Sequence, residues 1–226
     1  MHTNHTITVP RTAHYSTIGE AGPHTRYFWI ACHGYGQLAQ NFIRPFHSIA
    51  AADTFILAPE GLSRFYWGGF TGEPVASWMT RAGRLHEIAD YSNYLTTLYD
   101  TFLARMPADV RIILLGFSQG CATQMRWAMR AFPAFHQLIF WAGSIPEDLD
   151  YRPRLDYFSG KDLHYVYGLE DPFITSERVA QQRSLIQSYG LQVLEHTFQG
   201  KHVVEEKTLK RLADLIRQSS PGARVT

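Results

Sequence analysis

Ser118 lies at the centre of the segment Gly-Phe-Ser-Gln-Gly, residues 116–120. A serine hydroxyl becomes a nucleophile when a base takes its proton and when nearby donors stabilise the oxyanion that its attack creates. Residues 110–115 are branched and apolar, which predicts a buried strand, and residues 121–132 have the spacing of a helix. A strand, a tight Gly-x-Ser-x-Gly turn and a helix together predict a nucleophile elbow with Ser118 at its tip.

Asp171 is the candidate acid of a catalytic triad. In chains with such an elbow, the acid and then the histidine follow the serine. Asp171 lies in a Leu-Glu-Asp-Pro loop directly after the strand predicted at residues 163–167, with Glu170 as its nearest rival. Asp162 precedes that strand, at the wrong end of a parallel sheet. A turn or a helix cap is the plainer explanation of an Asp-Pro pair, but the position favours catalysis.

His202 is the candidate base. It lies in the Gln-Gly-Lys-His loop after the strand predicted at residues 191–198. His196 falls inside that strand, which favours a structural role, and His136 and His164 precede strands. His33 precedes the serine, and we expect it to brace a loop.

Two backbone amides are candidates for the oxyanion hole. The Gln119 N–H begins the helix after the serine, where it has no partner within the helix. The second donor of such a site comes from the loop after an early strand. The His-Gly-Tyr-Gly segment at residues 33–36 fits, with the Tyr35 N–H as the donor.

The remaining pattern predicts an α/β fold. We expect a mostly parallel sheet with helices on both faces, because buried strands alternate with helices and short loops. The expected strands are residues 26–32, 54–58, 110–115, 137–142, 163–167 and 191–198, after an opening strand or hairpin at residues 6–9 and 13–18. The expected helices are residues 38–52, 85–106, 121–132, 175–189 and 203–218. In such sheets the site lies at the carboxyl ends of the strands.

Residues 61–79 are rich in aromatic side chains and glycine and show neither the strand nor the helix period, which predicts a long irregular loop. Five aromatic residues in it are candidates for a substrate pocket: Phe65, Tyr66, Trp67, Phe70 and Trp78. They either line a groove for the acyl part of a substrate or pack the loop onto the body.

Bulk composition narrows the function further. The net charge of +1 produces no strong positive field that would attract nucleic acid or an anionic membrane. No apolar segment is long enough to span a membrane. Cys32 and Cys121 predict two reduced, buried thiols in a cytoplasmic protein. We expect residues 1–226 to form one domain with a frayed tail at 219–226. The histidines have no metal-ligand spacing and no nucleotide-binding motif is present, so we expect neither a metal nor a cofactor.

Five motifs carry a resemblance to a known family. They are residues 33–36 (His-Gly-Tyr-Gly), 57–61 (Leu-Ala-Pro-Glu-Gly), 116–120 (Gly-Phe-Ser-Gln-Gly), 168–172 (Gly-Leu-Glu-Asp-Pro) and 200–202 (Gly-Lys-His). Over residues 26–216 the chain resembles the phospholipase/carboxylesterase family of α/β-hydrolases, which includes acyl-protein thioesterases. Lys201 stands where many members have glycine, and Tyr35 where many have a branched aliphatic residue.

The resemblance implies Ser118, Asp171 and His202 as the triad and the Tyr35 and Gln119 amides as the oxyanion hole. It also implies possible homodimers. The expected activity is hydrolysis of short-to-medium acyl carboxylic esters through an acyl-enzyme. A thioesterase or a lysophospholipase would use the same triad. From a different class, a catalytically silent hydrolase fold would act as a binding protein, but such descendants usually lose the serine or the histidine.

Overall fold

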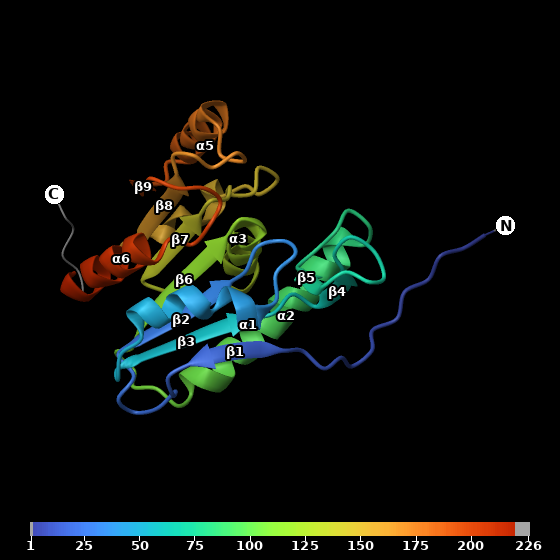
Figure 1. Cartoon of the computed structure of the whole chain (residues 1–226), viewed down its shortest axis with the longest axis horizontal. Helices are drawn as coiled ribbons and strands as arrows, with labels where there is room; N and C mark the ends of the chain where they lie inside the picture. The colour runs from blue at the N-terminus through green and yellow to red at the C-terminus, as the bar shows by residue number, and fades with distance from the viewer. Residues whose placement is uncertain (1, 220–226) are drawn as a thin grey trace.

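A seven-stranded sheet forms the centre of the computed structural model, which describes residues 2–219 (Figure 1). The strand order is β1-β3-β2-β6-β7-β8-β9, and only β1 is antiparallel to its neighbour. The strands are β1 (Tyr15–Ile18), β2 (Tyr27–Cys32), β3 (Thr54–Pro59), β6 (Arg111–Phe117), β7 (Gln137–Trp141), β8 (Asp162–Gly168) and β9 (Val193–Phe198). The predicted α/β class with a mostly parallel sheet is confirmed.

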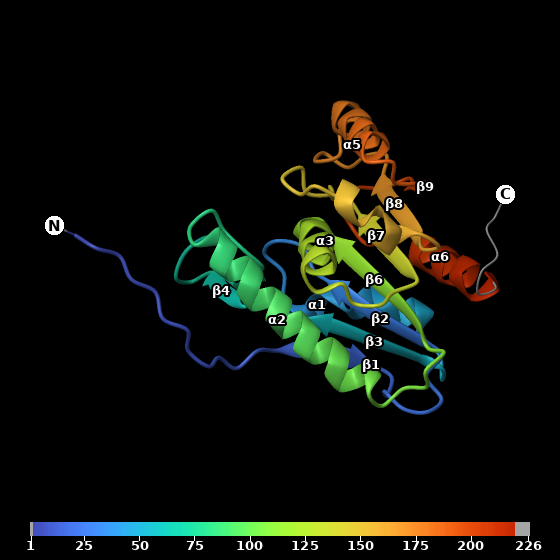
Figure 2. The ribbon, with the colours of Figure 1, turned by 180° about the vertical axis from the view of Figure 1, so that it is seen from behind.

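Helices cover both faces of this sheet (Figures 1 and 2). One face carries α2 and α3, which pack on each other, and the opposite face carries α1, η1 and α6. The helices are α1 (Ala39–Phe42), η1 (Arg44–Ile49), α2 (Arg84–Leu103), α3 (Gln119–Ala131), η2 (Arg152–Arg154), α4 (Leu155–Phe158), α5 (Ser176–Ser188) and α6 (Glu206–Gln218). Because both faces are covered, the central strands are buried along their length, which is why they read as continuous apolar runs.

Residues 61–79 differ from the prediction of an irregular loop. They form a two-stranded antiparallel hairpin, β4 (Ser63–Tyr66) with β5 (Pro74–Ser77). Its turn contains Gly68 and Gly69, both with positive φ, a conformation that glycine adopts without strain. Two four-residue strands are too short to show a clear period in the sequence.

Residues 38–52 also differ, since the expected single helix is divided into α1 and the 3₁₀ helix η1. Pro45 lies at the start of η1, where its missing N–H costs no hydrogen bond, but it cannot continue a helix from before it.

The expected strand at residues 6–9 does not form, and β1 begins only at Tyr15. The short helices η2 and α4 were not expected. The other helix boundaries differ from the prediction by a few residues. Of the tail expected to fray, residues 220–226 lie outside the described residues.

Candidate active site

Ser118 occupies the sharp turn between β6 and α3. Its backbone has φ 52° and ψ −114°, which is an unusual conformation for a residue with a side chain. Such strain persists only where the surroundings enforce it. A Cβ on Gly116 would lie 2.4 Å from the Gly120 carbonyl oxygen, and one on Gly120 would lie 2.1 Å from that of Cys32. The flanking glycines are therefore required by backbone packing.

The hydroxyl of Ser118 is free to react. Ser118 is the N-cap residue of α3, yet its side chain does not accept a hydrogen bond from the helix. Within residues 2–219 its hydroxyl makes no hydrogen bond, so its oxygen is not engaged by another protein group. The amino end of α3 also presents unpaired N–H groups and a partial positive charge beside it.

His202 and Asp171 form a hydrogen-bonded pair. The His202 Nδ1 lies 2.7 Å from Asp171 Oδ2, and because a carboxylate only accepts, Nδ1 carries the proton. Asp171 Oδ1 accepts a second hydrogen bond from the Phe173 N–H at 2.8 Å. The Asp171 side chain is fully buried, whereas the His202 side chain is 21% exposed. The Nε2 of His202 is thus left as the basic nitrogen on the open side of the pair.

The loops that carry this pair are joined backbone to backbone. The Glu170 N–H donates to the Gly200 carbonyl at 2.9 Å, and a Cβ on Gly168 would lie 2.2 Å from the same oxygen. The Trp141 indole N–H donates to the Val203 carbonyl at 2.8 Å and so ties the histidine loop to β7. The Glu170 side chain is exposed, so Asp171 rather than its rival meets the histidine.

Aromatic contacts place His202 next to the elbow. The Phe117 ring, one residue before the serine, lies 4.8 Å from the His202 ring, centroid to centroid. The Phe173 ring also contacts the imidazole, in an edge-on arrangement with a centroid distance of 4.9 Å. No hydrogen bond joins the Ser118 hydroxyl to His202 in the described structure, and in ligand-free sites such bonds are often longer than in the complex.

His33 braces the loop after β2, as expected. Its Nδ1 lies 2.7 Å from the Gly34 carbonyl, and its Nε2 accepts a hydrogen bond from the Gly61 N–H at 2.9 Å. Burial lowers the pKa of His33 to about 4, so the ring is neutral at physiological pH. A neutral ring is required for this pattern, since Nε2 must accept.

The acidic and histidine side chains that the sequence analysis set aside make their hydrogen bonds with residues other than Ser118, Asp171 and His202. His164 pairs with His196 at 3.0 Å and with the Gln137 carboxamide at 2.6 Å. Asp162 accepts from the other end of Gln137, and His136 accepts from the Ile112 N–H. Among the residues that the structure describes, no group of three or more His, Cys, Asp or Glu side chains is arranged to hold a metal ion, and no helix is long and apolar enough to cross a membrane.

Residues 33–36, the loop after β2 that carries a candidate oxyanion donor and is called the oxyanion loop below, contain an amide without an acceptor between two that are hydrogen-bonded. The Gly34 N–H donates to the Gln37 side chain at 2.8 Å, and the Gly36 N–H donates to the Ala76 carbonyl at 2.9 Å. Between them the Tyr35 N–H has no acceptor in the described part of the chain, and the same holds for the Gln119 N–H at the start of α3. These are the two amides that the sequence selected.

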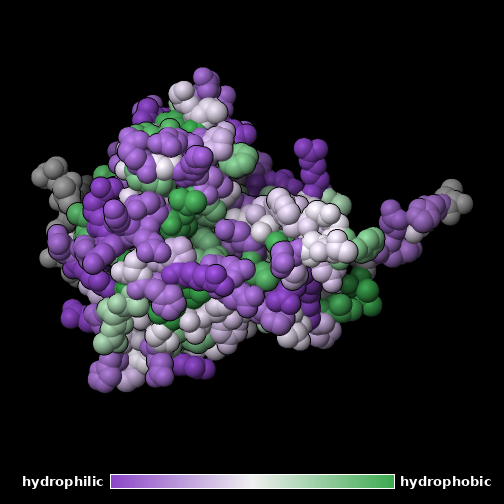
Figure 3. All heavy atoms as spheres, viewed as in Figure 1, coloured by the Kyte–Doolittle hydropathy of each residue, from purple (hydrophilic) through white to green (hydrophobic). Residues whose placement is uncertain are grey.

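Four of the five aromatic pocket candidates are at least partly exposed to solvent. Phe65 and Trp67 contact Tyr35 at centroid distances of 5.2 and 5.8 Å. Trp67 and Tyr66 are each 55% exposed and Phe70 is 96% exposed. Apolar atoms reach the surface in separate patches rather than one continuous face (Figure 3).

Trp78, the fifth candidate, differs from these four. It is 1% exposed, and its indole N–H donates to the His33 carbonyl at 2.9 Å. It therefore lies beneath the oxyanion loop, and its prediction as part of an open pocket wall is not supported.

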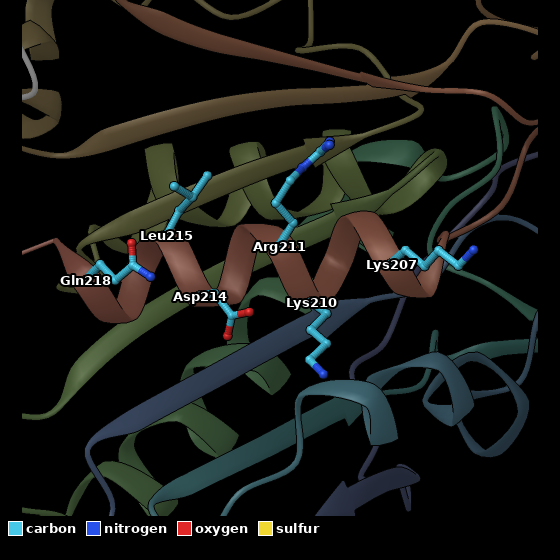
Figure 4. Close-up of a pocket in the computed structure, with 6 residues that line it drawn as sticks. All are labelled: Lys207, Lys210, Arg211, Asp214, Leu215 and Gln218. Atoms are coloured by element: carbon cyan, nitrogen blue, oxygen red, sulfur yellow. The ribbon is translucent and has the colours of Figure 1, made fainter.

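Two surface grooves lie away from the candidate site. One, of about 370 Å³, follows the exposed side of α6 (Figure 4). Its lining residues are Lys207, Lys210, Arg211, Asp214, Leu215 and Gln218. A second, of about 390 Å³, lies between α5 and β9. Neither groove is lined by a residue of the elbow or of the His202–Asp171 pair.

Comparison with solved structures gives the same fold at low sequence identity. The acyl-protein thioesterase 2 of Zea mays matches with a TM-score of 0.70 at 15% identity, covering 91% of this chain and 98% of that one. A phospholipase/carboxylesterase from Dyadobacter fermentans matches with a TM-score of 0.63 at 16% identity (93% and 99% covered). The Bacillus cereus carboxylesterase matches with a TM-score of 0.65 at 12% identity (91% and 94% covered). A search of curated proteins found no match.

The sheet order, the strained serine turn and these neighbours define an α/β-hydrolase. The family model described as "Serine hydrolase (FSH1)" matches residues 33–211, most of the chain. The chain belongs to that family and is a serine hydrolase, and its predicted resemblance to phospholipase/carboxylesterase proteins is confirmed at the level of the fold.

Proposed function

We propose that the protein is a carboxylesterase in which Ser118 is the nucleophile, His202 the base and Asp171 the acid, within one α/β-hydrolase domain. The observation that carries this proposal is the 2.7 Å contact between His202 Nδ1 and the buried Asp171, next to a serine with a free hydroxyl on a strained turn. Asp171 fixes the imidazole so that Nε2 is unprotonated and faces outward.

In the first step His202 Nε2 takes the Ser118 proton while the oxygen attacks the acyl carbon. The Tyr35 and Gln119 amides receive the oxyanion, because neither donates elsewhere in the described structure. Each such donor is worth roughly 3 kcal/mol of barrier lowering. The imidazolium, stabilised by Asp171, then protonates the leaving alcohol, and an acyl-enzyme remains.

In the second step a water molecule attacks the acyl carbon of the ester on Ser118. His202 takes the proton of the water, and the tetrahedral intermediate collapses with return of that proton to Ser118. The acid is released and the enzyme is restored, so the cycle needs no cofactor or metal.

We propose short-to-medium acyl chains as substrates. The aromatic rings of Tyr35, Phe65 and Trp67 cluster beside the oxyanion loop and offer an apolar surface next to the nucleophile. The bulk of Tyr35 restricts the space for the acyl group, which favours a chain of limited length.

A p-nitrophenyl ester series from acetate to palmitate tests this proposal on wild type and Ser118→Ala. We expect hydrolysis with an optimum at short-to-medium chains, and loss of activity in the variant by a factor on the order of 10³ or more. Acyl thioesters and lysophospholipids belong in the same panel, since the same groups would cleave them. If wild type and variant are equally inactive on every substrate, the esterase proposal fails and a binding protein remains.

We also propose a cytoplasmic location, because Cys32 and Cys121 are buried, unpaired thiols. A homodimer, implied by the family resemblance, is tested by sedimentation of the purified protein.

A further inference from the structure

The two amides of the proposed oxyanion hole belong to segments far apart in sequence. Tyr35 follows β2, and Gln119 follows β6. An oxyanion is stabilised only if both N–H groups lie about 2.7–3.1 Å from the same oxygen, so the distance between the two segments must be held closely. A displacement of about 1 Å can cost on the order of a hundredfold in rate.

The Gln119 side chain ties the elbow to residues 77–79, which are the last residue of β5 and the two residues after it. Its Oε1 accepts the Trp78 N–H at 3.1 Å, and its Nε2 donates to the Met79 carbonyl at 3.0 Å. The Ser77 hydroxyl lies 3.3 Å from the same carboxamide. Both ends of the carboxamide are used, so its orientation is fixed.

The same segment also ties down the loop that carries Tyr35. The Trp78 indole N–H donates to the His33 carbonyl, and the two rings lie 5.0 Å apart. One residue before this segment, the Ala76 carbonyl accepts the Gly36 N–H, and the Ala76 N–H donates to the Gln37 carbonyl. Hydrogen bonds therefore fix the Tyr35 loop on both sides of the donor.

We infer that the Gln119 carboxamide and the Trp78 indole are positioning residues that hold the two oxyanion donors at their working separation. The inference rests on the proposed function. Direct packing of Gly120 on the Cys32 carbonyl also brings the two segments together, but such packing limits approach without fixing orientation. The hydrogen bonds through residues 77–79 supply that orientation.

Trp78→Phe is the first test, with Trp127→Phe as its matched control. Both indoles are buried, and each donates one hydrogen bond of 2.9 Å, Trp78 to the His33 carbonyl and Trp127 to the Thr96 hydroxyl between α2 and α3. The two variants therefore lose the same group at similar depth. We expect Trp78→Phe to lower kcat by about tenfold or more with KM nearly unchanged, and Trp127→Phe to keep wild-type kcat.

Gln119→Met and Gln119→Glu test the role of the Gln119 carboxamide. The first removes both polar ends of the side chain, and the second keeps the acceptor for Trp78 but turns an oxygen toward the Met79 carbonyl. We expect both to lower kcat at constant KM. In the double variant with Trp78→Phe, the losses should be clearly less than multiplicative, because both act through the same segment.

A trifluoromethyl ketone inhibitor separates positioning from simple loss of stability, since its adduct with the serine carries an oxyanion. Its inhibition constant should rise in Trp78→Phe by the same factor as kcat/KM falls, at temperatures well below the measured Tm of each variant. If Trp78→Phe and Trp127→Phe lose kcat equally, or if KM rises instead of kcat falling, the inference is wrong while the esterase remains. If wild type hydrolyses no ester or thioester, the proposed function fails first.

Discussion

The nucleophile elbow, residues 116–120, and the β4–β5 hairpin lie beside the same oxyanion loop but are built in opposite ways. In the elbow, Gly116 and Gly120 leave less than 2.5 Å for an added Cβ, and Ser118 is held at positive φ. In the hairpin, Trp67 and Phe70 are mostly open to solvent, and a Cβ at the turn glycines Gly68 and Gly69 would meet nothing within 4 Å.

From this difference we expect the elbow to serve the chemical step and the exposed part of the hairpin to serve substrate recognition. In the proposed mechanism the backbone of the elbow must direct the Ser118 hydroxyl at the reacting carbon and the Gln119 amide at the oxyanion, so the elbow has no room for change. The hairpin presents aromatic surface whose composition can vary without disturbing the sheet. Substitutions in the elbow and in the residues that meet it should therefore change kcat, whereas substitutions of the exposed aromatic residues of the hairpin should change KM and the preferred substrate.

Asp171→Asn should have the largest effect. An asparagine can donate to His202 Nδ1, which favours the tautomer with the proton on Nε2, and that nitrogen can then no longer take the serine proton. We expect kcat to fall on the order of 10³–10⁴-fold with little change in KM. Glu170→Gln is the control, since its exposed side chain neighbours Asp171 in sequence without meeting the histidine. Equal losses in the two variants would assign the role of Asp171 to the loop as a whole.

Gly120→Ala tests how closely the elbow is packed. Its new Cβ would lie 2.1 Å from the Cys32 carbonyl oxygen, so either strand or helix must move. Overpacking of this kind costs about 1–3 kcal/mol of unfolding free energy, and we expect kcat to fall by about a hundredfold because Ser118 and the Gln119 amide move with it. Gly22→Ala, where a Cβ would meet nothing within 4 Å, should change neither Tm nor kcat appreciably. Chemical denaturation and ester hydrolysis measure both quantities, and an active, stable Gly120→Ala would contradict the comparison.

Trp67→Ala should change recognition and leave the chemistry intact. Trp67 contacts Tyr35 and packs on Gly36, so its loss removes aromatic surface next to the oxyanion loop. We expect KM for medium-chain esters to rise by about three- to tenfold, with acetate hydrolysis nearly unchanged. Phe70→Ala, at the 96% exposed tip, should have a smaller effect on every ester. A fall in kcat on acetate would show that the hairpin also positions the catalytic groups.

The strained serine turn and the candidate acid and base could be selected from the sequence because their signals are local. Each lies directly after a buried strand, and the order of strands in a parallel sheet places those ends together. The sequence already favoured Asp171 over its neighbour Glu170, and the structure adds the 2.7 Å contact of Asp171 with His202 and the exposure of the Glu170 side chain.

The hairpin and the Gln119–Trp78 contacts could not be predicted for two reasons. The strands of the hairpin are four residues long, and glycines interrupt the aromatic run, so no period emerges. Gln119 and Trp78 are separated by 41 residues, and nothing in either local sequence indicates that their polar groups meet. Trp78 was accordingly grouped with the other four aromatic pocket candidates, although it is buried and they are not.

His164→Gln should leave kcat unchanged and alter only how stability depends on pH. His164 is buried on β8 between His196 and Gln137, with Asp162 nearby, and burial lowers its pKa from 6.5 to about 4. Between these two pH values the unfolded chain binds a proton that the folded protein does not bind. The stability due to the neutral ring is therefore complete above pH 6.5 and is lost as the pH falls toward 4.

The loss amounts to at most about 1.4 kcal/mol per pH unit for each such histidine, and His33 contributes in the same direction with the same pKa of about 4. Removing His164 should reduce the slope of unfolding free energy against pH by about that amount between pH 6 and pH 4.5, measured by urea denaturation. His33 braces the oxyanion loop, so replacing it should reduce the slope and kcat together. An unchanged slope in His164→Gln would mean that His164 accepts a proton in the folded protein over this range, despite its burial.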